Sequence, residues 1–317
     1  MKTYIAGRLL QSVVVIILVV VIVFVVIHLV PGDPVVAMMG TQSSVTPQML
    51  ATLRHNWGLD RPIYVQFASW VFGLLHGDLG LSFQTQAPVS ALLANELPAT
   101  VELAVASIIV SLLVAVPGGM LSAIYENSPL DYFVTGLVTL AMSVPGFWVS
   151  IMLIYLVAVN NRWLPTGGYI PFGEDPLGNL RFLILPAGTL GVLTAAPIMR
   201  YLRSSLLDEL RQDYIVTARS KGLSEYKVMF RHAARNAMIP TLTIVALQFG
   251  SSLIGGVVVM EYVFHWPGIG TQLVDAVFNR DYFVLQSMCL VVAVFVVILN
   301  LAVDILYTLL DPRIAYT

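Results

Sequence analysis

Six stretches of the chain lack Asp, Glu, Lys and Arg over lengths that could cross a lipid bilayer, and this constrains the fold more than any other feature. A transmembrane helix needs about 20 consecutive apolar residues. The chain is 58% hydrophobic and 11% charged, so most of its surface cannot face water. We therefore predict an all-α membrane protein with six transmembrane helices, in the windows Arg8–Asp33, Glu102–Glu126, Asp131–Arg162, Arg181–Arg200, Arg235–Glu261 and Asp281–Asp304.

The first window also resembles a secretory signal, because Lys2 and Arg8 precede an apolar core. That core runs from Leu9 to Val30, which is longer than the core of a signal, and no small-x-small cleavage site ends it. We predict that residues 1–30 remain as the first transmembrane helix. Two further charge-free runs, 34–53 and 79–95, are rich in residues with polar side chains that lipid would leave unpaired, so we reject them as spans.

The distribution of Lys and Arg predicts the orientation in the membrane. With a cytoplasmic N-terminus, the inner segments carry eleven of these residues and the outer segments five. Cytoplasmic loops are enriched in Lys and Arg, so both termini are predicted to face the cytoplasm. The predicted organisation is the first helix (1–30), an extracytoplasmic helical segment (31–98), a five-helix transmembrane core (99–310) containing a cytoplasmic loop (203–238), and a cytoplasmic tail (311–317).

Two short helices are predicted in the outer segment. Thr46 is suited to cap a helix with Pro47 in its first position, and Gly58 is placed to end it. A second helix after Pro62 has an apolar face and stops near Gly77 and Gly80. These helices either cover the outer mouth of the bundle or form a docking surface for a partner that delivers a substrate.

The cytoplasmic loop contains a helix–glycine–helix pattern. The first helix, with Tyr214 and Ala218, is predicted to end near Gly222, where φ can become positive without penalty. Ser224 is suited to cap a second, short helix with Glu225 in its first turn. A basic cytoplasmic loop follows from membrane topology alone, so the charges by themselves do not indicate a function.

The order of residues in this loop resembles the EAA loop of ABC importer permeases, in the peptide and nickel branch. In that family a short coupling helix docks in a cleft of the ATPase subunit. Val216-Thr217-Ala218 occupies the place of Glu-Ala-Ala before Gly222, so the Glu is missing, and Pro240 comes later than in the generic motif. The resemblance assigns the coupling role to Thr217, Ala218, Gly222, Ser224, Glu225, Tyr226, Phe230, Arg231 and His232.

Further short motifs extend the resemblance over nearly the whole chain. They are 31–34 (Pro-Gly-Asp-Pro), 58–62, 77–82, 97–100, 266–270 (Trp-Pro-Gly-Ile-Gly), 280–282, 304–307 and 311–313. Each is weak alone, but their order and spacing make a chance match improbable. One departure is Phe283, since the branch usually has Pro after Asp-Tyr.

The chain shows no sequence signature of an enzyme. None of the three lysines follows a Gly, so it has no phosphate-binding loop, and neither His-Glu-x-x-His nor Gly-x-Ser-x-Gly occurs. Scattered histidines and a single cysteine, Cys289, give little support for a metal site and exclude an intrachain disulfide. The net charge of -2 gives no indication of nucleic-acid binding.

Polar residues within the apolar windows are candidates for a translocation pathway, because they are costly in lipid. We single out Gln248, Ser252 and Asn300. Ser251 with Gly255, and Ser252 with Gly256, also have the small-x-x-x-small spacing that favours close helix packing. Prolines with adjacent glycines at 117–119 and 145–146, together with Pro186 and Pro197, are expected to kink or loosen the spans.

Together these features predict half of the translocation pathway of an ATP-driven importer in a bacterial inner membrane. The resemblance implies a second, paralogous permease, two ABC ATPase subunits that bind ATP and Mg²⁺, and an extracytoplasmic solute-binding protein. No cofactor is expected in this chain. Short peptides are the expected cargo, with nickel chelates or glutathione as alternatives within the class. A secondary transporter or channel is the alternative from another class, although we find neither inverted repeats nor paired intramembrane charges; a membrane enzyme is the third.

Overall fold

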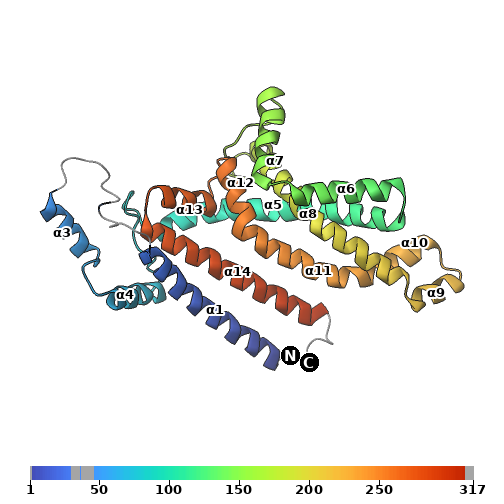
Figure 1. The fold of residues 1–317 in the computed structure, drawn as a ribbon, viewed down its shortest axis with the longest axis horizontal. Helices are drawn as coiled ribbons and strands as arrows, with labels where there is room; N and C mark the ends of the chain where they lie inside the picture. Colours follow the sequence, from blue (N-terminus) through green and yellow to red (C-terminus); the bar gives the residue numbers. More distant parts are fainter. Residues whose placement is uncertain (1, 30–35, 37–45, 311–317) are drawn as a thin grey trace.

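The computed structural model describes residues 2–29, 36 and 46–310, and these fold almost entirely as helices (Figure 1). The motif at 31–34 and the tail at 311–317 lie outside the described residues. Segments named η are π-helical. The elements are α1 (Lys2–Leu29), α3 (Pro47–Asn56), α4 (Ile63–Leu75), α5 (Val89–Ile124), α6 (Pro129–Ser143), α7 (Gly146–Leu153), η1 (Ile154–Asn160), α8 (Pro176–Leu210), α9 (Asp213–Ser220), α10 (Glu225–Lys227), η2 (Val228–Ala233), α11 (Ala234–Ser251), η3 (Ser252–Gly256), α12 (Val257–Val263), α13 (Ile269–Phe278) and α14 (Tyr282–Leu310).

Four helices in the described part are long and apolar enough to cross a membrane: α1, α5, α8 and α14. Helix α6 and the α7–η1 segment qualify together as a fifth span, bent by 103°. The bend falls at Pro145, as the Pro-Gly pair predicted. The predicted window from Arg235 to Glu261 is divided among α11, η3 and α12 and is not among these candidates. The structure therefore supports four or five spans by length and composition.

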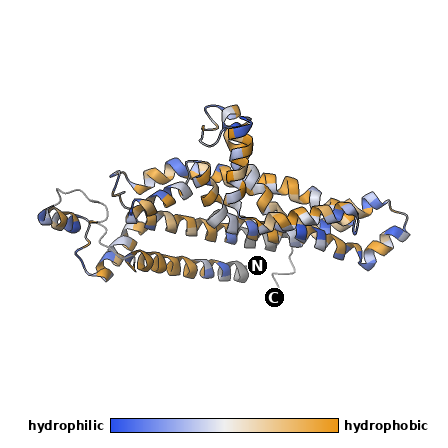
Figure 2. Ribbon diagram, turned by 45° about the horizontal axis from the view of Figure 1, so that its top comes forward, coloured by the Kyte–Doolittle hydropathy of each residue, from blue (hydrophilic) through white to orange (hydrophobic). Residues whose placement is uncertain are grey.

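The long helices consist mostly of hydrophobic residues (Figure 2), and many of their large hydrophobic side chains are exposed, which is typical of helices surrounded by lipid. Helix α1 is apolar around most of its circumference, and many of its Val, Leu and Ile side chains are exposed. It packs mainly along α14. Hydrophilic residues gather instead on α3 and around α9 and α10, at opposite ends of the molecule.

Helices α5 and α8 form the centre of the bundle, and glycines allow their close approach. A Cβ atom at Gly119 would lie 3.0 Å from the carbonyl oxygen of Met199, and one at Gly191 would lie 2.6 Å from Cβ of Val110. Both helices continue through their internal prolines, Pro98 and Pro117 in α5 and Pro186 and Pro197 in α8. The Pro117-Gly118-Gly119 sequence thus serves close packing within a continuous helix.

The two helices predicted in the outer segment are present. The Thr46 side chain accepts a hydrogen bond from the Met49 amide at 3.3 Å, with Pro47 in the first helical position, and Gly58 has a φ of +66° after the helix end. In α4, Phe67 and Trp70 pack on Phe24 near the end of α1, with ring centroids 5.1 and 5.9 Å apart respectively. Helix α5 already begins at Val89, so it starts before the boundary predicted at residue 98.

Candidate functional site

The loop between α8 and α11 projects at one end of the molecule and has the predicted helix–glycine–helix form (Figure 1). Helix α9 ends at Ser220, and Gly222 follows with a φ of +75°. The Gly222 amide donates to the carbonyl of Arg219 (2.9 Å) and the Leu223 amide to that of Ala218 (3.4 Å). These two bonds form a Schellman motif, which needs a residue in the left-handed region and so favours glycine.

One side of this loop is held by a buried hydrophobic cluster. Ile215 and Ala218 of α9 and Val228 and Ala233 of η2 are buried. They pack with the end of α8 and the start of α11, namely Leu202, Leu206, Leu207, Ala234 and Ala237, and with Ala123 of α5. The loop is therefore a packed extension of the helical bundle. Because its buried residues contact α5, α8 and α11, a movement of the loop would shift these helices.

An ion pair joins the two helices across Gly222. The Arg219 guanidinium donates from Nε to Oε1 of Glu225 at 2.9 Å and from its terminal nitrogen to Oε2 at 3.1 Å. Hydrogen bonding from Arg219 lowers the pKa of the Glu225 carboxyl below its ordinary value. Both side chains are largely solvent-exposed, so the pair contributes to the orientation of the loop more than to stability.

The opposite side of the loop presents an exposed aromatic pair. The rings of Tyr226 and Phe230 lie 4.5 Å apart, centroid to centroid, and the residues are 69% and 46% exposed. Val216 on α9 is also exposed. Aromatic side chains that pack together on a rigid, projecting element are typical of protein interaction sites.

The other residues assigned to coupling lie on the same two elements. Thr217 and Arg231 are exposed, and His232 is half-buried. The Thr217 hydroxyl donates to the Asp213 carbonyl at 3.0 Å, within its own helix. Ser224 occupies the capping position with extended backbone, but its side chain makes no capping hydrogen bond, so the prediction is right in position and wrong in mechanism. The second helix also changes to π-helical geometry at Val228 and continues into α11.

Two polar contacts that the sequence did not reveal connect this loop to the bundle. The Tyr214 hydroxyl donates to Glu209 of α8 at 2.5 Å and accepts a hydrogen bond from Asn236 of α11 at 3.0 Å. Burial, followed by the Glu209 carboxylate, raises the pKa of the Tyr214 hydroxyl. Tyr214 thus joins three helices, through partners up to 22 residues away, beyond the range of local sequence patterns.

A further contact that the sequence did not reveal joins α6 and α8. The Arg203 guanidinium makes two hydrogen bonds to the buried Asp131 carboxylate, at 2.7 and 2.6 Å. The Ser122 hydroxyl and the Asn127 amide also donate to Asp131, so its charge is well paired. The only signal in the sequence was a charged residue at the edge of an apolar window.

At the other end of the bundle, Glu261 is buried beneath the 266–270 motif. Its Oε2 accepts hydrogen bonds from the amides of Gly270 (2.6 Å) and Thr271 (3.3 Å) at the start of α13. A Cβ atom at Gly268 would overlap this carboxylate. The motif is thereby explained as a structural turn around a buried acid.

Two of the three predicted pathway residues lie together. Gln248 and Ser252 both line a cavity of about 340 Å³ between α7, α8 and the α11–α12 helix, together with Thr194 and Phe147. Asn300 does not line it: Oδ1 of Asn300 lies beside Gly250, 3.4 Å from where a Cβ would be, where α14 meets α11. Of the small residues, Gly256 faces Leu190, whereas Gly255 has open space around it, so only one of the two pairs supports close packing.

The described residues contain no group of three or more His, Cys, Asp or Glu side chains that could hold a metal ion.

Comparison with known proteins identifies the family. The family described as "Binding-protein-dependent transport system inner membrane component" matches residues 115–316. Its N-terminal counterpart, "Binding-prot-dependent transport system membrane comp, N-term", matches residues 1–104. The chain belongs to this family. It is a multi-pass permease of the peptide branch of ABC importers.

Two relatives align along nearly their whole length. The oligopeptide transport system permease protein AppB of Bacillus subtilis (strain 168) is 40% identical over 319 residues, covering all of both chains. The dipeptide transport system permease protein DppB of Escherichia coli (strain K12) is 38% identical over 318 residues, covering 92% of this chain and 93% of its own. Like these relatives, the chain is a permease subunit of a transport system.

Proposed function

We propose that this permease forms half of a translocation pathway for short peptides and that its 203–238 loop couples the pathway to ATP hydrolysis on a partner subunit. The observation that carries the proposal is the loop itself: one side is packed onto three long helices and the other presents Tyr226 and Phe230 to solvent. A groove in an ATPase subunit would receive this aromatic pair. The chain alone cannot supply the energy, so ATP and Mg²⁺ belong to two ATPase subunits.

The mechanism is alternating access. Closure of the ATP-bound subunits would move the loop as one body, because Gly222, the Arg219–Glu225 pair and the buried cluster hold α9 and α10 together. That movement reaches α8 and α11 directly, and these helices border the cavity that contains Gln248 and Ser252. Hydrolysis would then allow the loop and the helices to return. We assign pathway contacts to Gln248 and Ser252 and helix packing to Asn300.

The partners follow from the incomplete pathway. The cavity beside Gln248 opens between helices of a single chain, so a second, paralogous permease would complete its wall. The exposed aromatic residues of the α7–η1 segment, among them Phe147, Trp148 and Tyr155, suit such a contact. A solute-binding protein would dock at the opposite end, near α3 and α4.

We further propose six spans, with α11, η3 and α12 as the fifth, both termini in the cytoplasm, and residence in the bacterial inner membrane.

Short peptides are the proposed cargo because both relatives above are named for oligopeptide or dipeptide transport. Nickel chelates and glutathione remain the alternatives. Competition for uptake into proteoliposomes that contain the full importer would separate these cargoes. Uptake blocked by unlabelled dipeptide but not by glutathione or a nickel chelate is the expected result.

The coupling role is tested by replacing the aromatic pair. Loss of one well-packed aromatic from an interface costs about 2 kcal/mol or more, so Phe230→Ala should weaken ATPase-subunit binding by roughly 30-fold. Tyr226→Ala should act similarly. Tyr125→Ala is the matched control, because Tyr125 is also exposed, at the end of α5, but lies outside the loop. Affinity purification of the complex and peptide-stimulated ATP hydrolysis provide the readouts.

Unchanged binding and hydrolysis in both loop variants would remove the coupling role from this surface. Ion-driven uptake by liposomes that contain only the purified chain would instead support a secondary transporter or channel.

A further inference from the structure

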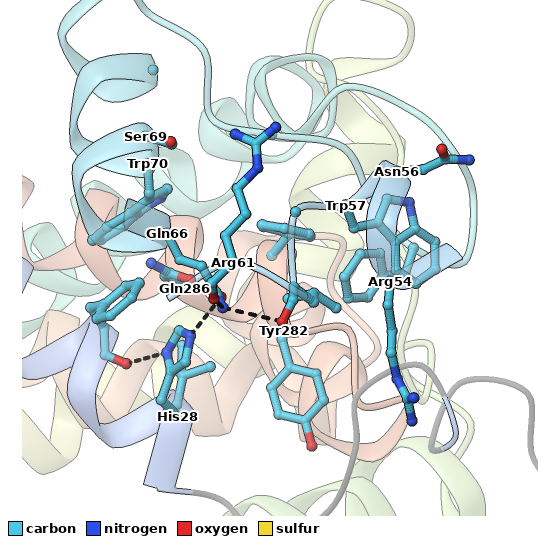
Figure 3. Close-up of a pocket in the computed structure, with 18 of the residues that line it drawn as sticks. His28, Arg54, Asn56, Trp57, Arg61, Gln66, Ser69, Trp70, Tyr282 and Gln286 are labelled. Atoms are coloured by element: carbon cyan, nitrogen blue, oxygen red, sulfur yellow. Dashed lines mark hydrogen bonds between the residues drawn. The ribbon is translucent and has the colours of Figure 1, made fainter. Parts of the chain in front are cut away.

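A cavity of about 520 Å³ lies at the outer-segment end of the bundle, away from the pathway residues. It is enclosed by the end of α1, by α3 and α4, and by the start of α14 (Figure 3). His28 contributes from the last turn of α1, and Tyr282 is the first residue of α14. Because α1 and α14 are candidate spans, the cavity lies at the level where the membrane meets water.

Two hydrogen-bond donors in this cavity have no partner. Gln286 is only 4% exposed, and its amide nitrogen Nε2 is buried without a hydrogen bond. The indole nitrogen Nε1 of Trp70 is also buried without a partner. Both residues line the same cavity. A buried, unpaired donor costs about 1–3 kcal/mol, so two donors at one cavity point to a ligand that accepts hydrogen bonds.

The remaining lining residues define the charge of this ligand. Arg61 contributes a guanidinium group to the lining, whereas the Arg54 side chain extends away from Trp70 and Gln286 (Figure 3). Among the described lining residues Asp78 is the one carboxylate, and its Oδ1 accepts a hydrogen bond from the Gly80 amide at 2.9 Å. The two unpaired donors and the Arg61 guanidinium together favour an anion. His28 is fixed by a bond from Nδ1 to the Phe24 carbonyl at 2.8 Å, so the site is partly preorganised.

The same cavity also has an apolar wall. Phe24 and Ile27 of α1, Phe83, and Phe283 of α14 line it, alongside Trp57. On the membrane side of this wall, α1 presents Val and Ile side chains that are about half exposed, including Val21, Ile22 and Val25. A ligand with an anionic head and apolar chains would fit both surfaces. A small inorganic anion would leave the apolar wall uncovered.

We propose that this cavity binds the phosphate headgroup of an anionic phospholipid, with acyl chains along α1 and α14. The headgroup accepts hydrogen bonds from Trp70 and Gln286 and is paired with the guanidinium of Arg61. The bound lipid would join α4 of the outer segment to the two peripheral spans. The site depends only on its position at the membrane surface, so it stands independently of the coupling role assigned to the loop.

The test is lipid retention by the purified full-length permease, measured by native mass spectrometry. Phosphatidylglycerol and phosphatidylcholine serve as probes of matched acyl length. Trp70→Phe retains the ring without the N–H, and Gln286→Met retains the side-chain length without the amide. Each lost bond to a charged group should lower phosphatidylglycerol retention by roughly tenfold. Arg61→Gln should reduce the preference for the anionic lipid. Arg181→Gln, at an exposed arginine outside the cavity, is the control and should behave like the wild type.

Arg61→Gln should keep wild-type retention of phosphatidylcholine, and all three cavity variants should keep wild-type thermal stability, which separates loss of the site from misfolding. Equal retention of the two lipids by the wild type would overturn the proposal, since it indicates only a non-specific lipid coat. Wild-type behaviour of both Trp70→Phe and Gln286→Met would overturn it too. Displacement of bound phosphatidylglycerol by millimolar inorganic phosphate or by a dipeptide would exclude a lipid as the natural occupant.

Discussion

Replacing Gly222 tests whether the geometry of the proposed coupling loop matters for transport. The residue has a φ of +75°, and a Cβ atom added to it would meet no atom within 4 Å. A substitution therefore introduces no steric clash, and its whole effect comes from the backbone. This separates the conformation of the Gly222 turn from the packing of the loop, which other changes in the loop would also disturb.

The magnitude follows from the backbone conformation. A left-handed φ costs an ordinary L-residue about 1–2 kcal/mol, and a β-branched residue suffers most. In Gly222→Val the Schellman turn should lose population by about 5- to 30-fold relative to turns with negative φ. Tyr226 and Phe230 would then be displaced relative to α9. Gly222→Asn should have a much smaller effect, because Asn tolerates this region.

The assay compares peptide uptake with ATP hydrolysis by the reconstituted importer. Gly222→Val should insert normally into the membrane, bind fewer ATPase subunits and hydrolyse ATP with little uptake. Gly77→Val is the matched control: its φ is +79°, it also has open space, and it lies at the opposite end of the molecule. Normal uptake by Gly222→Val, or an equal defect in both variants, would refute the argument.

Three further predictions concern the charges and the packing. The pKa of the Glu225 carboxyl is lowered, so the ion pair with Arg219 stabilises the turn fully at pH values above the ordinary carboxyl pKa of 4.5. This stabilisation is lost as the pH falls through the lowered pKa. The hydrogen-exchange rate of the Gly222 amide should therefore be slower in the wild type than in Glu225→Gln at pH 7. In acid the two proteins should exchange at the same rate. Asp131→Asn leaves a guanidinium near the bundle core without its counter-charge, and thermal unfolding in detergent should show a loss of about 3 kcal/mol; an unchanged melting temperature would contradict the buried pair. Gly191→Ala should destabilise the bundle by about 1–3 kcal/mol in the same measurement, since its Cβ would overlap Val110, whereas Gly188→Ala on the same helix meets nothing within 4 Å and should be tolerated.

Much of the structure of the 203–238 loop was predictable because its determinants are local. The end of α9, the positive φ of Gly222 and the adjacency of Tyr226 and Phe230 all depend on residues within a few positions. The Thr46 cap of α3 and the break at Pro145 are predictable for the same reason. Sequence patterns that span a few neighbouring residues act through local backbone geometry, which is nearly independent of the rest of the fold.

Other features depended on partners far apart in the chain. The contact between Asp131 and Arg203 joins residues separated by 72 positions. The lipid-binding cavity combines α1, α3, α4 and α14. Pro117 and Pro186, expected to kink or loosen their helices, lie inside α5 and α8, each of which stays helical across its proline. The three residues predicted to line the pathway do not lie together, because Gln248 and Ser252 line one cavity and Asn300 does not.

The sequence by itself determined that the chain is a helical membrane permease and where the 203–238 loop lies. Lipid excludes charged and unpaired polar groups, so charge-free windows in the sequence predict membrane spans without a structure. The turn at Gly222 is required by local backbone geometry. Only the tertiary structure decided which charges are buried together, how sharply the helices bend and which side chains surround a cavity. These properties arise from the packing of distant helices against one another, and neither hydropathy nor local spacing specifies that packing.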